Sequence, residues 1–567
     1  MSDSISFTFE GRELKGRRGE SLAAALIAAG VRSLRTTRSG AERSIFCGMG
    51  ICQDCLVEVD GQTNRRACMV KLDRPIAVRR EGFARAVAGP AIGALPRTAD
   101  DIPEETPEVL VVGAGPGGLS AAIAARRAGA KVIVLDERPQ PGGQYFKQIA
   151  VDVGRAAPDA QHEEGRRLIE RARDVGVEIR SDVQVWGAFP PSSLAATQGA
   201  FVRSFAPERL IVATGAYERG LPFPGWTLPG VMTTGAAQTL WRSYRRLAGR
   251  RILIAGNGPL NLQVAAELAA GGAEIAAVVE VAEVPAVRSL LALASMASAS
   301  PRLVLEGMRY RRQLQAARVP VLYGSVVTRV EQSAGGLTVD VAQLGPRSGA
   351  ERRYSVDTIC LGYGFHPSNE LLRALGCEHS YDSARDQLVT RVSPDGTGRT
   401  TVPTVFALGD CTGLGGARTA LAQGTLTGFA AVSELGHPIA GDLTAERTSA
   451  ERALARHRSF QASLWRLYAA PRLGLELALP DTVVCRCEEI SAGAIQAAVD
   501  EGCPSIGELK RTTRAGMGAC QGRYCGPLLS KLLAERLRRQ PDEALHFAPR
   551  APIKPISVAD IARAPQR

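Results

Sequence analysis

The chain has 567 residues, several times the length of a typical domain, so we expect several domains, each with a sizeable core. Sixty glycines and an aromatic content of only 5% fit a nucleotide-binding α/β protein, in which glycine serves tight turns and phosphate loops. The net charge of +12 is spread along the chain, which favours a solvated basic surface and argues against nucleic-acid binding.

The first residues lack the basic flank and apolar stretch of a secretory signal, and no later run is long and apolar enough to span a membrane. We therefore expect a cytoplasmic protein without a membrane span. Disulfides are rare in that reducing compartment, so clusters among the twelve cysteines are better explained as metal ligands.

Residues 1–88 are expected to form a ferredoxin domain. Alternating apolar residues predict a strand over 4–10, and Ser21 can cap a helix over 22–29. Three cysteines then share one loop with the spacing C-x4-C-x2-C, and a fourth follows after twelve more residues. This is the plant-type ferredoxin arrangement for one 2Fe-2S cluster, whereas zinc sites usually repeat a C-x2-4-C pair. The expected ligands are Cys47, Cys52, Cys55 and Cys68.

A linker over 89–107 leads to the first part of an FAD-binding domain, expected over 108–225. A buried strand over 109–112, a G-x-G-x-x-G turn, a helix over 119–128 and a strand over 132–135 follow in the order of a dinucleotide-binding motif. Gly113 makes the turn, Gly115 lets a pyrophosphate approach the backbone, and Gly118 allows the helix to pack on the strand. Asp136 follows the second strand and can accept a hydrogen bond from a ribose hydroxyl.

Three further segments indicate FAD rather than NAD. A second glycine turn follows the acidic residue, a strand and turn over 210–215 resembles the segment that returns past the cofactor, and a strand over 405–408 leads to a carboxylate suited to a ribityl hydroxyl. A helix expected over 418–432 could stabilise negative charge on the reduced flavin through its N-terminus. The residues expected to contact FAD in these segments are Gly142, Gly143, Gln144, Thr214, Gly215, Gly409, Asp410, Gly415 and Gly416.

A second Rossmann-like unit is expected over 226–355, nested between FAD-binding segments over 108–225 and 356–440. A strand over 251–254, a G-x-G turn, a helix to residue 270 and a further strand make Gly256, Gly258 and Glu280 candidates for a second nucleotide. Asn261 stands where a third small residue would allow close packing, and residues 284–317 form a long insertion. If a dinucleotide binds, Glu280 would favour NAD over NADP. Binding of NAD, binding of ATP and a purely structural role all stay open.

A connecting segment over 441–480 precedes a small helical domain over 481–540 and a tail over 541–567. A C-x-C pair and a C-x4-C pair are separated by 32 residues, and helices are expected over 492–501 and 527–538. This pattern resembles the 2Fe-2S domain of bacterioferritin-associated ferredoxin (BFD), although zinc could also take four thiolates. The expected ligands are Cys485, Cys487, Cys520 and Cys525.

The remaining cysteines stand singly and are expected to be packed thiols, so no dithiol relay of the disulfide-reductase type is predicted. No histidine, serine or carboxylate stands out as an acid or base for a substrate, and the catalytic residues therefore stay unknown. The single cysteines are Cys360, Cys377, Cys411 and Cys503.

The predicted fold is α/β: two nested Rossmann-like dinucleotide-binding domains of a two-domain flavoprotein, preceded by a β-grasp 2Fe-2S ferredoxin domain and followed by a small helical BFD-like 2Fe-2S domain. This order resembles the ferredoxin-fused A-type subunit of the opine oxidase, hydrogen cyanide synthase and D-hydroxyproline or proline dehydrogenase family. It is also similar to the N-terminal part of the sarcosine oxidase alpha subunit. Segments 214–219, 224–230 and 513–518 carry the resemblance.

The resemblance implies an electron-transfer subunit that contains FAD and two 2Fe-2S clusters. In that family a partner, a D-amino-acid-oxidase-like flavoprotein subunit, oxidises a CH-NH or CH-NH2 donor such as an amino acid or opine. The A-type subunit then passes the electrons to an acceptor such as a quinone or another carrier. The resemblance also leaves room for FMN at the interface with the partner, and the substrate cannot be read from this chain.

Two other functions stay open at this point. A self-sufficient NADH-dependent flavin and iron-sulfur reductase would use the nested domain to reduce its own FAD. A non-enzymatic iron-sulfur scaffold or redox sensor would turn over neither amines nor NADH.

Overall fold

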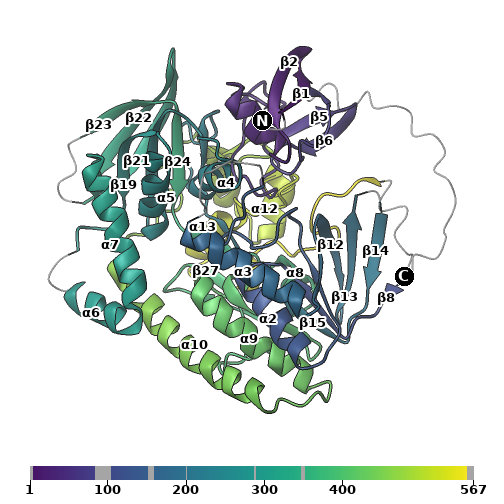
Figure 1. Ribbon diagram of the computed structural model, residues 1–567. Helices are drawn as coiled ribbons and strands as arrows, with labels where there is room; N and C mark the ends of the chain where they lie inside the picture. Colours follow the sequence, from purple (N-terminus) through teal and green to yellow (C-terminus); the bar gives the residue numbers. More distant parts are fainter. Residues whose placement is uncertain are drawn as a thin grey trace.

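Four units and one long helix make up the structure, a computed structural model that describes residues 4–82, 104–150, 159–199, 201–285, 289–345 and 351–558. In Figure 1 the N-terminal unit (purple) lies at the top, directly above the C-terminal unit (yellow). The nested nucleotide-type unit (teal) lies to their left, and the outer one (blue to green) lies below them and to their right. The N-terminal and C-terminal units are therefore neighbours in space, and a hydrogen bond from Arg486 to Asp54 joins them.

The N-terminal unit is a mixed sheet that carries one buried helix. Its elements are β1 (Ser4–Phe9), β2 (Arg12–Arg17), α1 (Leu22–Ala28), β3 (Arg35–Thr36), β4 (Glu42–Arg43), β5 (Leu56–Val59), β6 (Gln62–Arg66) and β7 (Ala77–Gly82). The strand order is β2-β1-β7-β3-β4, with β5 paired to β7 and to β6. Helix α1 begins where Ser21 Oγ accepts a hydrogen bond from the Ala24 N–H, and its apolar residues are buried against the sheet.

The outer Rossmann unit is built on a parallel sheet of apolar strands. Its elements are β8 (Glu104–Glu105), β9 (Val109–Val112), α2 (Pro116–Arg127), β10 (Val132–Leu135), α3 (Ala160–Asp174), β11 (Glu178–Arg180), β12 (Val183–Phe189), β13 (Ser193–Gln198), β14 (Phe201–Phe205), β15 (Arg209–Val212), β28 (Val405–Ala407) and α9 (Ala417–Ser433). The parallel order is β11-β10-β9-β15-β28, and all of β9 is buried, as expected of a central strand covered on both faces. Strand β8 pairs with β14, so the end of the segment expected as a linker, 89–107, joins this unit.

The nested unit lies between two segments of the outer unit. Its elements are β16 (Ala216–Glu218), β17 (Val231–Thr233), α4 (Thr234–Tyr244), β18 (Arg251–Gly256), α5 (Pro259–Ala270), β19 (Glu274–Glu280), α6 (Leu290–Ala299), α7 (Pro301–Ala316), β20 (Val321–Tyr323), β21 (Ser325–Ser333), β22 (Gly336–Gln343), β23 (Arg352–Val356), β24 (Thr358–Gly362) and β25 (Phe365–Pro367). The parallel order is β17-β24-β18-β19-β20. The expected end of this unit at residue 355 is wrong, because β24 pairs in parallel with both β17 and β18.

The rest of the chain packs over these units. Its elements are α8 (Glu370–Ala374), β26 (His379–Asp382), β27 (Gln387–Thr390), η2 (Gly409–Cys411), α10 (Asp442–Leu467), β29 (Val483–Cys485), β30 (Ile490–Ser491), α11 (Ala492–Asp500), α12 (Ile506–Thr513), α13 (Gly526–Arg536) and η3 (Glu543–Leu545). Helix α10 fills the expected connecting segment and packs on α9 and α6. The described part of the expected tail, 541–558, also packs on the outer unit, because the Ile553 N–H donates to the Trp186 carbonyl and Lys554 pairs with Glu137.

This topology confirms the predicted fold class. The unit with one parallel sheet is inserted within the sequence of the unit with the other. A mixed ferredoxin-like sheet precedes both units, and a small helical unit follows them. Within the described ranges, none of the helices combines the length and the apolar character that crossing a membrane requires.

Helices α2 and α9 cross at a glycine contact that yields a stability prediction. A Cβ at Gly428 would lie 2.3 Å from the Ala121 carbonyl oxygen, whereas a Cβ at Gly307 in helix α7 would meet nothing within 4 Å. We expect Gly428→Ala to destabilise the protein by about 1–3 kcal/mol through overpacking. The matched control, Gly307→Ala, should be stabilising by about 0.5–1 kcal/mol through helix propensity. Thermal unfolding followed by circular dichroism measures both, and equal midpoints would contradict the packing account.

Candidate functional site: a nucleotide cavity and two cysteine clusters

A cavity of about 1200 Å³ lies between the outer and nested units. Its wall collects residues from many separate segments of the chain, and these include most of the residues expected to hold FAD. Those that line the cavity are Gly113, Gly115, Asp136, Gly143, Gln144, Thr214, Gly215, Gly409, Asp410, Gly415 and Gly416, together with Gly258 of the nested unit. Gly118, Gly142, Gly256 and Glu280 are not part of the wall and lie behind these loops.

Two glycine turns touch at the base of the cavity. A Cβ at Gly143 would lie 2.8 Å from the Cα of Gly115, and one at Gly118 would lie 1.9 Å from the Gly113 carbonyl oxygen. A side chain at Gly143 would push the two turns apart, and one at Gly118 would push helix α2 away from the first turn. The turn that precedes helix α2 can therefore bring its backbone N–H groups against an anion such as a pyrophosphate.

The Asp136 carboxylate anchors the first turn by accepting hydrogen bonds from backbone N–H groups. Its Oδ2 accepts a hydrogen bond from the Ala114 N–H at 2.6 Å, and its Oδ1 accepts one from the Arg138 N–H at 2.8 Å. Burial raises the pKa of this carboxyl, although the two N–H groups oppose the shift. The carboxylate thus fixes the loop while it stays at the cavity wall, where the sequence placed a ribose contact.

Glu280 repeats this arrangement in the nested unit. Its Oε2 accepts from the Gly258 N–H and its Oε1 from the Ala282 N–H, both at 3.0 Å. The donors lie 22 residues before and two residues after the acid, as they do for Asp136. Burial raises the pKa of Glu280 to about 7. The local framework of a dinucleotide loop is therefore present twice.

Asn261 fits the nested loop instead of obstructing it. Its side chain is buried, accepts from the Thr234 hydroxyl at 3.1 Å and donates to the Gly362 carbonyl at 3.1 Å. Gly256 and Gly362 leave the space for the amide, since a Cβ at either would lie within 2.7 Å of it. The long insertion after β19 forms helices α6 and α7, which line the cavity.

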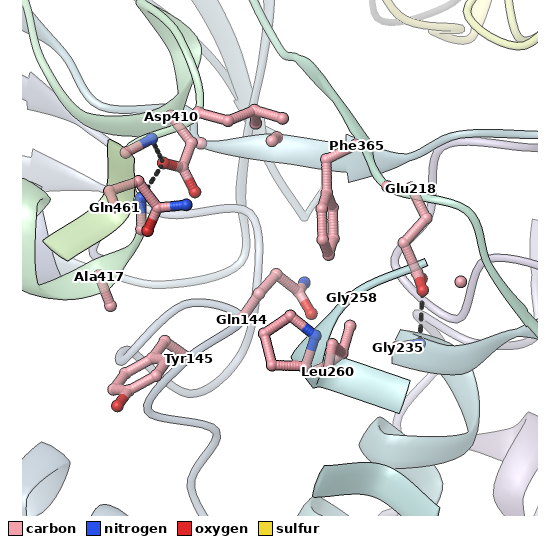
Figure 2. A pocket seen from close by; sticks show the side chains of 18 of the residues that line it. Gln144, Tyr145, Glu218, Gly235, Gly258, Leu260, Phe365, Asp410, Ala417 and Gln461 are labelled. Carbon is pink, nitrogen blue, oxygen red and sulfur yellow. Dashed lines mark hydrogen bonds between the residues drawn. The ribbon is translucent and has the colours of Figure 1, made fainter. Parts of the chain in front are cut away.

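Asp410 and the start of helix α9 form one side of the cavity (Figure 2). Asp410 Oδ1 accepts hydrogen bonds from the Gly415 and Gly416 N–H groups, both at 2.9 Å. These bonds hold the turn before Ala417, where the helix begins, so that the positive end of the helix dipole lies at the cavity. In Figure 2, Gln461 of α10 lies beside Asp410, and Gln144 lies in the middle of the view.

Two buried titratable side chains on the cavity wall were not predicted from the sequence as site residues. Glu218 accepts from the Gly235 N–H at 2.8 Å, and burial raises its pKa to about 7. Lys147 donates to the Gln144 carbonyl at 2.6 Å and to Gln238 Oε1 at 2.9 Å, and burial, helped by nearby arginines, lowers its pKa to about 7. The only sequence signal for Glu218 was its place in segment 214–219, and Lys147 had none.

The first four cysteines are buried and meet as two pairs. The thiol of Cys47 is hydrogen-bonded to that of Cys52, and the thiol of Cys68 to that of Cys55. Cys47 Sγ also accepts from the Met49 N–H at 3.5 Å and the Cys52 N–H at 3.4 Å. Burial opposes ionisation of Cys47, but these hydrogen bonds outweigh it and lower the pKa of the thiol to about 6.

The second four cysteines also meet in two pairs, Cys485 with Cys525 and Cys487 with Cys520. The hydrogen bond from the Cys525 thiol is the largest cause that lowers the pKa of Cys485, to about 7. Gly518 closes the loop around them, since a Cβ there would lie 2.2 Å from the Cβ of Cys487.

This pairing fits 2Fe-2S clusters better than zinc. A 2Fe-2S cluster needs two thiolates at each of two irons, whereas a structural zinc ion needs four ligands around one point. Among the residues that the structure describes, no group of three or more Cys, His, Asp or Glu side chains is arranged to hold a single ion.

The two cysteine sites and the cavity are contiguous, which the sequence did not predict. The Cys487 thiol lies 3.9 Å from the Cys52 carbonyl oxygen, and Met49 and Ile51 of the first cysteine loop line the cavity. The Phe46 carbonyl at the start of that loop accepts from the Thr233 N–H, next to helix α4. The first cysteine loop therefore lies between the cavity and the second cysteine site.

The single cysteines belong to neither of the two cysteine sets, although Cys411 is hydrogen-bonded to Thr214 and Gly215 of the cavity wall. Cys360 is in the core of the nested sheet, Cys377 and Cys411 are buried in the outer unit, and Cys503 is in the core of the C-terminal unit. Burial raises the pKa of Cys360 above its usual range and that of Cys411 to about 11, as expected of packed thiols.

Three family models match the chain in the order of its units. Residues 2–82 match a 2Fe-2S iron-sulfur cluster binding domain, residues 107–424 match pyridine nucleotide-disulphide oxidoreductase, and residues 483–535 match a BFD-like 2Fe-2S binding domain. Together with the cavity and the paired thiols, these matches define a flavin-dependent oxidoreductase with a 2Fe-2S domain near each end. That class is at odds with the scaffold or sensor alternative.

Relatives of known function match along most of the chain. The A-type subunit of opine oxidase from Rhizobium meliloti (strain 1021) is 32% identical over 460 residues, which cover 80% of this chain and 98% of the relative. Hydrogen cyanide synthase subunit HcnB of Pseudomonas aeruginosa is 31% identical, with 79% and 96% covered. The alpha subunit of sarcosine oxidase from Corynebacterium sp. (strain P-1) is 26% identical, with 76% of this chain but only 44% of the relative covered.

These matches confirm the predicted resemblance: the chain belongs to the family of the A-type subunits of opine oxidase and hydrogen cyanide synthase subunit HcnB. A solved structure, L-proline dehydrogenase from P. horikoshii, has the same fold, with a TM-score of 0.71, 19% identity and coverage of 99% of this chain and 98% of that one.

The contact between the glycine turns gives a first test of the cavity. We expect Gly143→Ala to lose most of its bound FAD, because the new methyl group would displace the turn that carries Gly115. Gly436→Ala is a matched control, since its φ of 86° is also positive and nothing lies within 4 Å of the added Cβ. Flavin content after gel filtration, measured by absorbance, decides the matter. Full FAD occupancy in Gly143→Ala would contradict the assignment.

The two cysteine sets give a reciprocal test. Cys55→Ala should remove half of the iron and acid-labile sulfide and leave the second cluster, and Cys520→Ala should remove the other half. Cys503→Ala, which removes a thiol outside both sets, should keep all of it. Iron and sulfide assays with electron paramagnetic resonance of the reduced protein give the readout. Loss of iron in the Cys503 variant alone would overturn the ligand assignment.

Proposed function

We propose that this chain is the FAD- and iron-sulfur-containing electron-transfer subunit of a heteromeric amine, amino-acid or opine dehydrogenase or oxidase. The observation that carries the proposal is the contiguity of the cavity with both cysteine sites. Because Met49 and Ile51 reach the cavity and Cys487 contacts Cys52, all three cofactors would lie along one path in one polypeptide.

The proposal assigns each cofactor to its residues. FAD would be held by the two glycine turns, by the 214–215 turn and by the start of helix α9. Its proposed contacts are Gly113, Gly115, Asp136, Gly143, Gln144, Thr214, Gly215, Gly409, Asp410, Gly415 and Gly416, while Gly118 and Gly142 would shape the turns behind them. The 2Fe-2S clusters would be held by Cys47, Cys52, Cys55 and Cys68, and by Cys485, Cys487, Cys520 and Cys525.

Bound clusters supply one-electron chemistry, and bound FAD exchanges electrons singly or in pairs. Electrons that arrive from a cluster bring no protons, so a flavin site needs a proton source within the protein. Lys147 Nζ and the Glu218 carboxyl are suited to hold that proton, because both are buried on the cavity wall and both change charge near neutral pH.

A catalytic partner would supply the electrons. The relatives at about 31% identity are named as subunits, which supports a multi-subunit assembly. We propose a D-amino-acid-oxidase-like flavoprotein as the partner, with FMN as a candidate cofactor at the interface and a quinone or another carrier as the acceptor.

One observation favours a second candidate, an NADH-dependent reductase. The hydrogen bonds of Glu280 to the Gly258 and Ala282 N–H groups repeat those of Asp136 in the outer unit, and Gly258 lies on the wall of the same cavity. The nested loop therefore has the framework for NAD, or for another nucleotide such as ATP. Under this alternative the chain needs no partner to reduce its flavin.

Reduction experiments separate the two functions. We expect the chain, purified anaerobically from its native host, to co-purify with a second FAD-containing subunit. An amino acid or opine should reduce its flavin only when that subunit is present. NADH should leave the flavin of the isolated chain oxidised over minutes. Rapid bleaching by NADH in the isolated chain, lost in Glu280→Gln, would instead establish the reductase.

A further inference from the structure

A buried ion pair closes the contact between the N-terminal and C-terminal units. Arg486 Nη2 lies 2.7 Å from Asp54 Oδ2, and its Nε donates to the same oxygen at 2.8 Å. The two side chains are 4% and 0% exposed. Both groups lose their hydration there, so such a pair often stabilises a protein no more than apolar packing would. Its presence calls for a reason other than stability.

Each member of the pair is set among cysteines of one cluster site. Arg486 lies in sequence between Cys485 and Cys487, and Asp54 directly precedes Cys55 and follows Cys52 by two residues. The ion pair is thus a direct link from one cysteine motif to the other. The Cys487 thiol meets the Cys52 carbonyl oxygen in the same contact.

The guanidinium of Arg486 is also fixed by aromatic rings from two other elements. It lies 3.8 Å from the ring centroid of Phe46 in the first cysteine loop and 4.6 Å from that of Trp226 in the nested unit. Its Nη1 donates to the Trp226 carbonyl at 2.8 Å. A planar guanidinium can stack and hydrogen-bond in this way, and an ammonium cannot. Arg486 therefore locks three units together at one point.

The charges around the pair differ in burial. Asp54 Oδ1 lies 3.4 Å from Arg35 Nη2, so the carboxylate serves two arginines, one from each side of the contact. A second pair, Arg43 with Glu489 at 3.2 Å, crosses the same contact, and its carboxylate is 16% exposed. Glu489 accepts from Ser39 of the N-terminal unit as well. The inner pair is thus fully buried, and the carboxylate of the outer pair is partly exposed.

We propose that Asp54 and Arg486 are positioning residues that hold the two cluster-binding loops against each other. The two residues also shift the potential of each cluster, Arg486 in one direction and Asp54 in the other. The inference rests on the proposed binding of a 2Fe-2S cluster by each set of thiols. A cluster becomes more negative on reduction, and nearby charge is one of the factors that set its potential. The cation therefore favours the reduced state of either cluster, and the carboxylate favours the oxidised state.

Two neutralising variants of the full chain test this assignment. In Asp54→Asn the arginines lose their counter-ion, so the reduction equilibria of both clusters should shift at least tenfold toward the reduced state, which is about 59 mV for a one-electron couple. In Arg486→Gln the carboxylate keeps only Arg35, and both equilibria should shift at least tenfold toward the oxidised state. Redox titration with dithionite, followed by electron paramagnetic resonance, measures both without substrate or partner.

Glu489→Gln is the matched control, because it removes a carboxylate from the same contact that is 16% exposed, whereas Asp54 is fully buried. Its shifts should be smaller than those of Asp54→Asn. Shifts in the same direction in Asp54→Asn and Arg486→Gln, or no shift in either, would overturn the assignment. Iron content distinguishes this failure from that of the proposed function, because a chain without iron fails the latter first.

The wild-type chain provides a test that does not depend on variants that fold. If the touching loops each bind a cluster, the two clusters should show magnetic interaction in their paramagnetic spectra when both are reduced. Because the inner pair is buried, that interaction should persist at about 1 M salt, where exposed ion pairs are screened within about 3 Å. Loss of the interaction at high salt would mean that the exposed charges hold the contact, and the positioning role would be overturned.

Discussion

Two loops at opposite ends of the sequence have to meet, and the architecture can be understood from that constraint. Cys487 and Cys52 are 435 residues apart in the chain, yet the thiol of one lies 3.9 Å from the carbonyl oxygen of the other. Electrons move readily only between closely spaced centres, so a chain with two cluster sites and a flavin cavity gains nothing if any of them is isolated. The first cysteine loop connects the three sites, because it contacts both the cavity and the second cysteine site.

The nested unit serves as the support for that contact. The start of helix α4 receives the first cysteine loop, because the Thr233 N–H donates to the Phe46 carbonyl and a Cβ at Gly48 would lie 3.0 Å from Ala236. Trp226 packs on Arg486 and donates to the Val483 carbonyl of the C-terminal unit. Lys554, beyond the second cysteine site, then pairs with Glu137 of the outer unit, which Arg66 of the N-terminal unit also contacts.

Local spacing made much of this predictable. Strand 109–112, the cap at Ser21 and the two cysteine patterns depend on residues close together in sequence, and the structure forms the corresponding elements. Long-range relations were not predictable. Nothing in the sequence near Arg486 indicates Asp54 as its partner, and β24 was assigned to the wrong unit because its apolar run fits either parallel sheet. Lys147 and Glu218 were missed because their titration depends on burial, which spacing does not encode.

The most direct test of the central claim is an anaerobic reductive titration of the isolated chain, with flavin and cluster absorbance recorded together. The account predicts an uptake of about four electrons per chain, two by FAD and one by each cluster, with all three centres reduced in one connected equilibrium. An uptake of about two electrons, with bleaching of the flavin and no paramagnetic signal from iron, would contradict it.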